Sequence, residues 1–224
     1  MKTFSHHWES GLAKVYRWLG NGLHYLVPLV LSLGLFLLGA AALDKQEEVK
    51  QKAQTELFST TKVLEVEITV EEKDWDTIRN QSRNFFTALS AQRKNGPIDS
   101  PYTYVTAKVK IGGVEYSKVG LRKKGFLGSL NSSRPSLKIK LNHLDKQAQL
   151  NGLTMLTFNN NQQDFTLMSQ TMGYALYNAA GSPAPRCGYA RITVNGKNLG
   201  VYAHVESMKK PLLRRDFGDD RGTL

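Results

Sequence analysis

The chain has 224 residues, a formal net charge of +11 and one cysteine. A single cysteine excludes an internal disulfide and a thiolate metal cage. Residues 45–224 are long enough for one domain with one modest core. They carry 27 basic and 17 acidic side chains, so most of the excess charge lies there. The excess suits an anionic partner such as a lipid headgroup or a nucleotide phosphate, with plain solubility as the alternative.

Residues 1–22 show the pattern of an amphipathic helix. Their apolar side chains recur at three- and four-residue steps, with the basic residues off that face. This arrangement is typical of a helix that lies in the headgroup layer of a membrane. The apolar positions are Phe4, Trp8, Leu12, Val15 and Leu19.

Residues 23–43 contain no charged side chain. At ~1.5 Å of rise per helical residue the run reaches about 31 Å, enough to cross a bilayer core of ~30 Å. We therefore expect a transmembrane anchor, followed by a polar juxtamembrane linker over residues 44–60. A long signal peptide is the alternative, because residues 40–42 are three alanines and suit cleavage. Lysine and arginine are almost balanced on the two flanks, so charge alone gives no orientation.

Strand patterns dominate residues 61–224. Alternating apolar and polar residues predict strands at 63–70 and 136–141. Turn residues between apolar runs predict turns and hairpins at Gly112-Gly113, Asn151-Gly152 and Asn195-Gly196. Helices are expected at 74–86, 165–180 and 207–217. The predicted fold class is α+β, with a mostly antiparallel sheet built from hairpins and interspersed helices, preceded by the amphipathic helix and one transmembrane helix.

The order of these segments resembles the spore-coat CotH kinase family. The likeness runs from about Val63 to Leu224 and is carried by the strings RPSLKIKL, LTFNNNQQDFT and GYARITVNGKNLGVYAHVE. It implies an atypical kinase that transfers phosphate from ATP to serine outside the cytosol or in spore coats. It also implies that residues 61–224 are the N-terminal half of a kinase-like domain, with the catalytic half absent.

Two cofactor-binding residues follow from the resemblance. Lys138, in SLKIKL, matches the strand lysine of the family, and Glu206, in VYAHVES, matches the acidic residue that ends its second hairpin. A strand lysine beside a glycine loop suits the α- and β-phosphates of a nucleotide, and the carboxylate would orient that lysine. The alternatives are an outward-facing lysine like Lys140 and an ordinary surface carboxylate.

A small-residue loop precedes the Lys138 strand. Gly125 and Ser129 offer backbone N–H groups and a hydroxyl to a phosphate, and Arg122 and Lys124 supply positive charge. The loop matches neither a Walker A motif nor GxGxxG, so a mobile turn is the alternative. No catalytic residue and no metal ligand is predicted in this chain.

Two functions compete on these observations. The favoured one is a non-catalytic accessory or docking subunit of a membrane assembly, with membrane lipid and other membrane-protein subunits as partners and no nucleic acid. The alternative is the N-terminal ATP-binding half of an extracytoplasmic serine kinase, which would use ATP and Mg²⁺. For both functions, the protein is expected to be a single-pass inner-membrane protein with its C-terminal domain outside the cytoplasm.

Overall fold

The computed structural model describes residues 36–84, 86, 100–126 and 131–221. The chain divides into two compact units, Met1–Lys50 and Gln51–Leu224. In the first unit residues 36–50 are helical, and in the second residues 51–57 are helical. The expected amphipathic helix over residues 1–22 lies outside the described residues.

The prediction of a transmembrane helix is wrong on the described part of the chain. No helix there is long and apolar enough to cross a bilayer. Residues 36–43 are helical, but the charged run that begins at Asp44 follows them directly, so the described apolar stretch is only about 12 Å long against the ~30 Å required. Residues 23–35 of the expected span lie outside the described residues. The expected fold class is corrected on this point, and the expected single-pass membrane location loses its basis.

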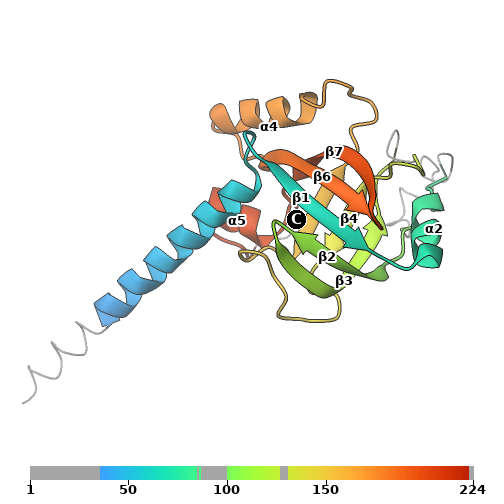
Figure 1. Ribbon diagram of the computed structural model, residues 1–224. Coiled ribbons are helices and arrows are strands. Elements are labelled where there is room, and N and C mark those ends of the chain that lie inside the picture. The colour runs from blue at the N-terminus through green and yellow to red at the C-terminus, as the bar shows by residue number, and fades with distance from the viewer. Residues whose placement is uncertain (1–35, 85, 87–99, 127–130, 222–224) are drawn as a thin grey trace, which may run out of the picture. The chain divides into compact units, whose positions relative to one another are not determined.

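Seven strands form a closed barrel in the order β1-β2-β3-β4-β5-β7-β6 (Figure 1). Neighbouring strands pair antiparallel, except that β1 pairs parallel with β6 and so closes the barrel. The strands are β1 (Val63–Thr69), β2 (Val105–Ile111), β3 (Val114–Lys123), β4 (Leu137–Lys140), β5 (Met155–Asn159), β6 (Cys187–Val194) and β7 (Lys197–Val205).

Several strands alternate apolar and polar residues, and because successive side chains of a strand point to opposite faces, the apolar ones fill the barrel. In β4, for example, Leu137 and Ile139 are fully buried, whereas Lys138 and Lys140 are partly exposed. The expected hairpin at Gly112-Gly113 is confirmed by the β2–β3 pairing. The hairpin at Asn195-Gly196 is confirmed by β6 and β7, with both turn residues at positive φ, as a two-residue turn of this kind requires.

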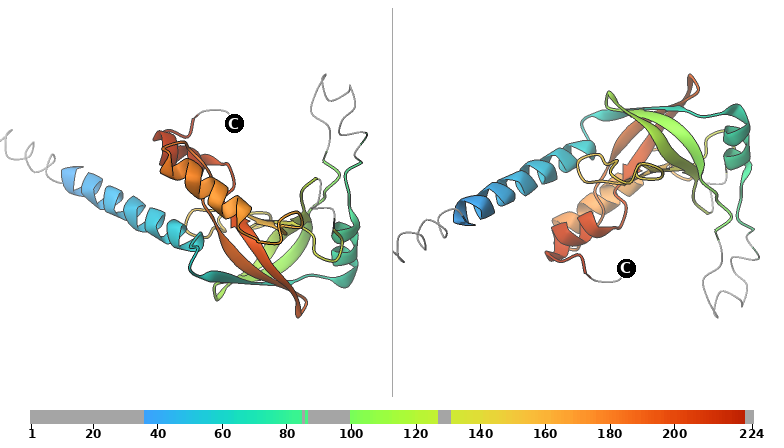
Figure 2. Two further views of the ribbon diagram at one scale, coloured as in Figure 1. Left: turned by 90° about the horizontal axis from the view of Figure 1, so that it is seen from above. Right: turned by 90° about the horizontal axis from the view of Figure 1, so that it is seen from below.

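In the part of the chain that the structure describes, three helices follow the first strand and lie around the barrel: α2 (Glu72–Asn80), α4 (Ser169–Ala179) and α5 (Lys210–Phe217). Figures 1 and 2 show α2 and α5 at opposite ends of the barrel. Each confirms an expected helix within shifted bounds. The expected helix at 165–180 begins later, because Leu167 has a φ of +60° and cannot continue a right-handed helix. Its apolar residues Met168, Met172 and Leu176 are exposed rather than buried.

Candidate functional site

Positively charged side chains gather on the outer face of β3 and β4. Arg122 of β3 stands directly opposite Lys138 of β4, and Lys138 stands opposite Thr157 of β5. Directly opposed residues in antiparallel strands have Cβ atoms about 5 Å apart, and like charges in such a pair repel. Lys209, just before α5, also contributes repulsion at Lys138. The fold therefore maintains an unfavourable concentration of positive charge here.

Arg122, Lys124 and Lys138 are called here the cation cluster. Little negative charge among the described residues offsets their positive charge. No ion pair links any of the three to a carboxylate in the described part of the chain. Arg122 Nε is buried without a hydrogen-bond partner, and the guanidinium lies over the ring of Tyr104. Burial, and then the charges of Arg122 and Lys209, lower the pKa of Lys138. An anion bound here would relieve the repulsion.

Lys124 connects the cation cluster to a cavity of about 360 Å³. Its ammonium donates a hydrogen bond to the side-chain oxygen of Asn159, and the Asn159 amide donates to Gln170 of α4 at 2.7 Å. Burial, followed by repulsion from Lys138 and Arg122, lowers the pKa of Lys124 to about 8. Lys124 therefore changes charge near neutral pH, where few lysines do.

The cavity has a polar lining. Such a lining suits a ligand that carries a phosphate and other groups that hydrogen-bond to side-chain amides. Besides Lys124 and Asn159, side-chain amides of Asn160 and Gln170 face it, together with the backbone of Gly125. Gly125 has a φ of +113°, a conformation that favours glycine. Its carbonyl accepts a hydrogen bond from the Tyr102 hydroxyl at 2.7 Å, which fixes the start of the loop.

Glu206 is expected to orient Lys138, but its contacts in the structure are with other residues. The Glu206 carboxylate is almost fully buried and accepts hydrogen bonds from the guanidinium groups of Arg186 and Arg215, both at 2.7 Å. It also accepts from the backbone N–H of Arg186 at 3.0 Å. No hydrogen bond or ion pair with Lys138 accompanies these contacts among the described residues. The predicted role of Glu206 toward a cofactor stays a prediction.

Of the six residues expected at the site, Arg122, Lys124 and Lys138 come together, and Gly125 lines the adjoining cavity. Ser129 lies outside the described residues. Asn159 and Lys209 were not foreseen, because their roles depend on contacts with residues remote in the sequence. The described residues contain no group of three or more His, Cys, Asp or Glu side chains suited to a metal ion. Asp164 borders the cavity, but its carboxylate accepts hydrogen bonds from the backbone N–H groups of Thr166 and of Ser169, the first residue of α4.

Residues 121–224 match the protein-family model described as CotH kinase protein. A curated relative, the inner spore coat protein H-like protein of Bacillus subtilis (strain 168), is 31% identical over 72 residues. That alignment covers 32% of this chain and 23% of the relative, so the chain spans less than a quarter of the relative's length. The predicted resemblance is confirmed from residue 121 onward. The cation cluster lies at the start of the matched region.

Proposed function

Because the region from residue 121 onward is of the CotH type, we propose that this chain binds the phosphates of ATP at the cation cluster. The observation that carries the proposal is a set of three cations on and just after the adjacent strands β3 and β4, none of which pairs with a carboxylate among the described residues. A triphosphate carries charge of the opposite sign and several acceptor oxygens, which lysine and arginine bind with charge-assisted hydrogen bonds. The polar cavity beside Lys124 would then receive another part of the nucleotide.

The proposal for this chain covers nucleotide binding, with Mg²⁺ entering as part of the bound Mg–ATP. Lys138 and Lys124 would hold phosphate oxygens, and Arg122 would supply further positive charge. Mg²⁺ keeps several waters and uses one or two carboxylates together with substrate phosphates. Phosphoryl transfer to serine needs in addition a carboxylate that orients the hydroxyl.

We expect Lys138→Ala to weaken ATP binding about 10- to 100-fold, the effect of one lost charge-assisted hydrogen bond. The fold should persist, since Lys138 makes no ion pair with a described residue and removal of a repelled charge costs little stability. Isothermal titration with Mg–ATP measures the affinity, and circular dichroism checks the fold. Lys140→Ala is the matched control, because Lys140 is two residues along the same face of β4. Equal affinities of the two variants would refute the phosphate site.

ATP binding should weaken as the pH rises above about 8, the value to which burial and neighbouring cations lower the pKa of Lys124. Below that pH the ammonium is charged and attracts phosphate; above it the neutral amine does not. Binding then takes up a proton, and the affinity falls by at most about tenfold per pH unit. Titrations between about pH 7 and about pH 9 measure this slope. In Lys124→Gln the dependence of ATP affinity on pH should vanish. If that variant keeps the same pH dependence, the titrating group is not Lys124.

A docking role is the second candidate, and exposed apolar side chains in α4 and in the segment just before it favour this role. Phe165 is 98% exposed, and Met172 and Leu176 are 60% and 70% exposed, an unusual gathering of large apolar side chains on a surface. The two candidates differ in one result. A docking role predicts that Lys138→Ala leaves assembly unchanged, whereas the nucleotide site predicts loss of ATP binding. The expected lipid partner has lost the support of the transmembrane helix, but the amphipathic helix that also predicts it lies outside the described residues. Membrane lipid and partner subunits both remain predictions.

A further inference from the structure

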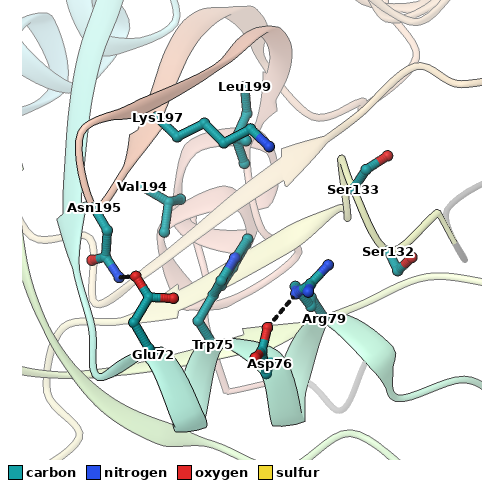
Figure 3. A pocket seen from close by; sticks show the side chains of 10 residues that line it. All are labelled: Glu72, Trp75, Asp76, Arg79, Ser132, Ser133, Val194, Asn195, Lys197 and Leu199. Atoms are coloured by element: carbon teal, nitrogen blue, oxygen red, sulfur yellow. Dashed lines mark hydrogen bonds and ion pairs between the residues drawn. The ribbon is translucent and has the colours of Figure 1, made fainter.

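A second cavity, of about 240 Å³, lies where α2 meets the β6–β7 hairpin. Figure 3 shows its lining: one face of α2, the turn at Asn195, and two serines from the loop ahead of β4. The α2 residues are at positions 72, 75, 76 and 79, which share one side of a helix because they are three and four residues apart. None of these residues belongs to the cation cluster.

An aromatic ring stands at the centre of this cavity. Trp75 is partly buried against the barrel core, and the rest of its ring faces the cavity between two polar pairs (Figure 3). On one side Glu72 accepts a hydrogen bond from the Asn195 amide at 3.2 Å. On the other side Asp76 pairs with Arg79 at 2.7 Å. The ring therefore has a polar pair on either side, and no other aromatic residue is among the lining side chains.

The polar groups around Trp75 retain hydrogen-bonding capacity. Asp76 accepts from Arg79 through one carboxylate oxygen, and Arg79 uses its Nε in that bond. Among the described residues, no hydrogen bond uses the other oxygen or the two terminal guanidinium nitrogens, which can therefore bind a ligand. The Lys197 ammonium has no hydrogen-bond or ion-pair partner in the described part of the chain, and Figure 3 shows it above the ring. The lining thus offers both donors and acceptors.

The charges of the lining exclude several ligand classes. Two carboxylates and two cations balance, so a phosphate would meet as much repulsion as attraction. The described residues offer no cluster of three metal-ligating side chains. A peptide that adds a strand needs a free sheet edge, and the closed barrel has none. The volume is below the ~300–1,000 Å³ usual for drug-sized ligands. Of these ligand classes, a small neutral molecule with many hydroxyls fits the volume and the charges of the lining.

We propose that this second cavity binds one sugar unit of a carbohydrate. Each sugar hydroxyl both donates and accepts a hydrogen bond, which matches a lining of paired carboxylates and cations. The apolar C–H face of a sugar ring packs on an indole ring, whose flat surface is apolar and whose edge is polar. Trp75 would hold that face, and Asp76, Arg79 and Lys197 would bind hydroxyls at the rim.

The test uses ¹H–¹⁵N NMR of the full chain titrated separately with glucose, galactose and N-acetylglucosamine. The chain has three tryptophans, and comparison with Trp75→Phe assigns the Trp75 indole signal. We expect that signal to shift and to saturate for at least one sugar, with a Kd of about 1–10 mM, the weak end of the affinity scale. Lys197→Ala should weaken that binding about 2- to 10-fold, the effect of one hydrogen bond.

Lys118→Ala is the matched control, since Lys118 is an exposed lysine of β3 that does not line the cavity. It should leave the titration unchanged. Two results would overturn the carbohydrate site: no saturable shift of the Trp75 indole with any of the three sugars, or an equal loss of affinity in both lysine variants. A saturating shift with the tripeptide Gly-Ser-Gly but with none of the sugars would likewise overturn it and indicate a peptide site. The ATP titration of Lys138→Ala is independent of all these outcomes.

Discussion

Glu206→Gln is expected to lower the free energy of unfolding by about 3 kcal/mol or more. The side chain of Glu206 is 1% exposed and pairs with two guanidinium groups, those of Arg186 and Arg215, which are 12% and 20% exposed. Arg215 also pairs with Asp216 at 2.7 Å, so among the described residues it is Arg186 whose charge would lose its carboxylate partner. Removing one partner of a buried ion pair typically costs ~3–5 kcal/mol, because the other charge is left uncompensated. Glutamine has nearly the same shape, so the loss reports charge rather than volume. Urea unfolding followed by circular dichroism measures the change.

The cost has a structural basis beyond the pair itself. Arg186 also donates hydrogen bonds to Gln54 and Thr55, in the helical segment ahead of β1. Arg215 lies in α5 and donates to the carbonyl of Ala184 at 2.8 Å. A single carboxylate therefore holds two segments, remote from each other in sequence, at the end of the barrel.

Glu65→Gln is a control that distinguishes the effect of burial from the effect of ion pairing, because Glu65 forms an ion pair at the protein surface. Glu65 accepts a hydrogen bond from Arg191 at 2.7 Å, the same distance as in the Glu206 pairs, but both side chains are about half exposed. Surface ion pairs contribute ~0–1 kcal/mol, so Glu65→Gln should change the unfolding free energy by less than about 1 kcal/mol. Similar losses in Glu65→Gln and Glu206→Gln would show that burial does not set the cost.

Local patterns in the sequence predicted the hairpins well, because alternation and turn chemistry act over few residues. The β2–β3 and β6–β7 hairpins follow from Gly112-Gly113 and Asn195-Gly196. The closure of the barrel did not follow, since β1 pairs with β6 across more than a hundred residues. Alternation shows that a strand has a buried face, but it does not show which remote strand lies beside it.

Only part of the candidate site could be predicted from the sequence, because contacts between remote segments again decide the rest. Lys138 follows from the resemblance to the family, and Arg122 from its place beside the small-residue loop; the β3–β4 register, which neither of these specifies, places them opposite each other. The partners of Glu206 depend on where α5 and the segment at Gln54 pack, which no local pattern specifies. The transmembrane prediction rested on hydropathy over residues 23–43, and no helix among the described residues is long and apolar enough to cross a bilayer.

Acid is expected to destabilise the protein through His204, with a loss of about 3 kcal/mol between pH 6.5 and pH 4. His204 is fully buried, and its ring stacks on Phe58 and Phe158 at centroid distances of 4.5 and 5.0 Å. Burial, together with the nearby charge of Arg186, lowers the pKa of His204 to about 4. The unfolded chain takes up the proton near pH 6.5, whereas the folded chain resists it until about pH 4. Stability is therefore complete above the unfolded pKa and falls as the pH drops, by about 1.4 kcal/mol per unit.

The hydrogen bonds of the ring explain why protonation is unfavourable. Nδ1 lies 3.1 Å from the carbonyl oxygen of Leu57, so it carries the proton and donates. Nε2 is buried without a partner, and a proton there would place a charged N–H where no acceptor is available. In His204→Phe the pH dependence between pH 6.5 and pH 4 should flatten, even if the loss of the Leu57 hydrogen bond lowers stability at every pH. Urea unfolding at a series of pH values measures both slopes, and a variant as acid-sensitive as the native chain would place the titrating group elsewhere.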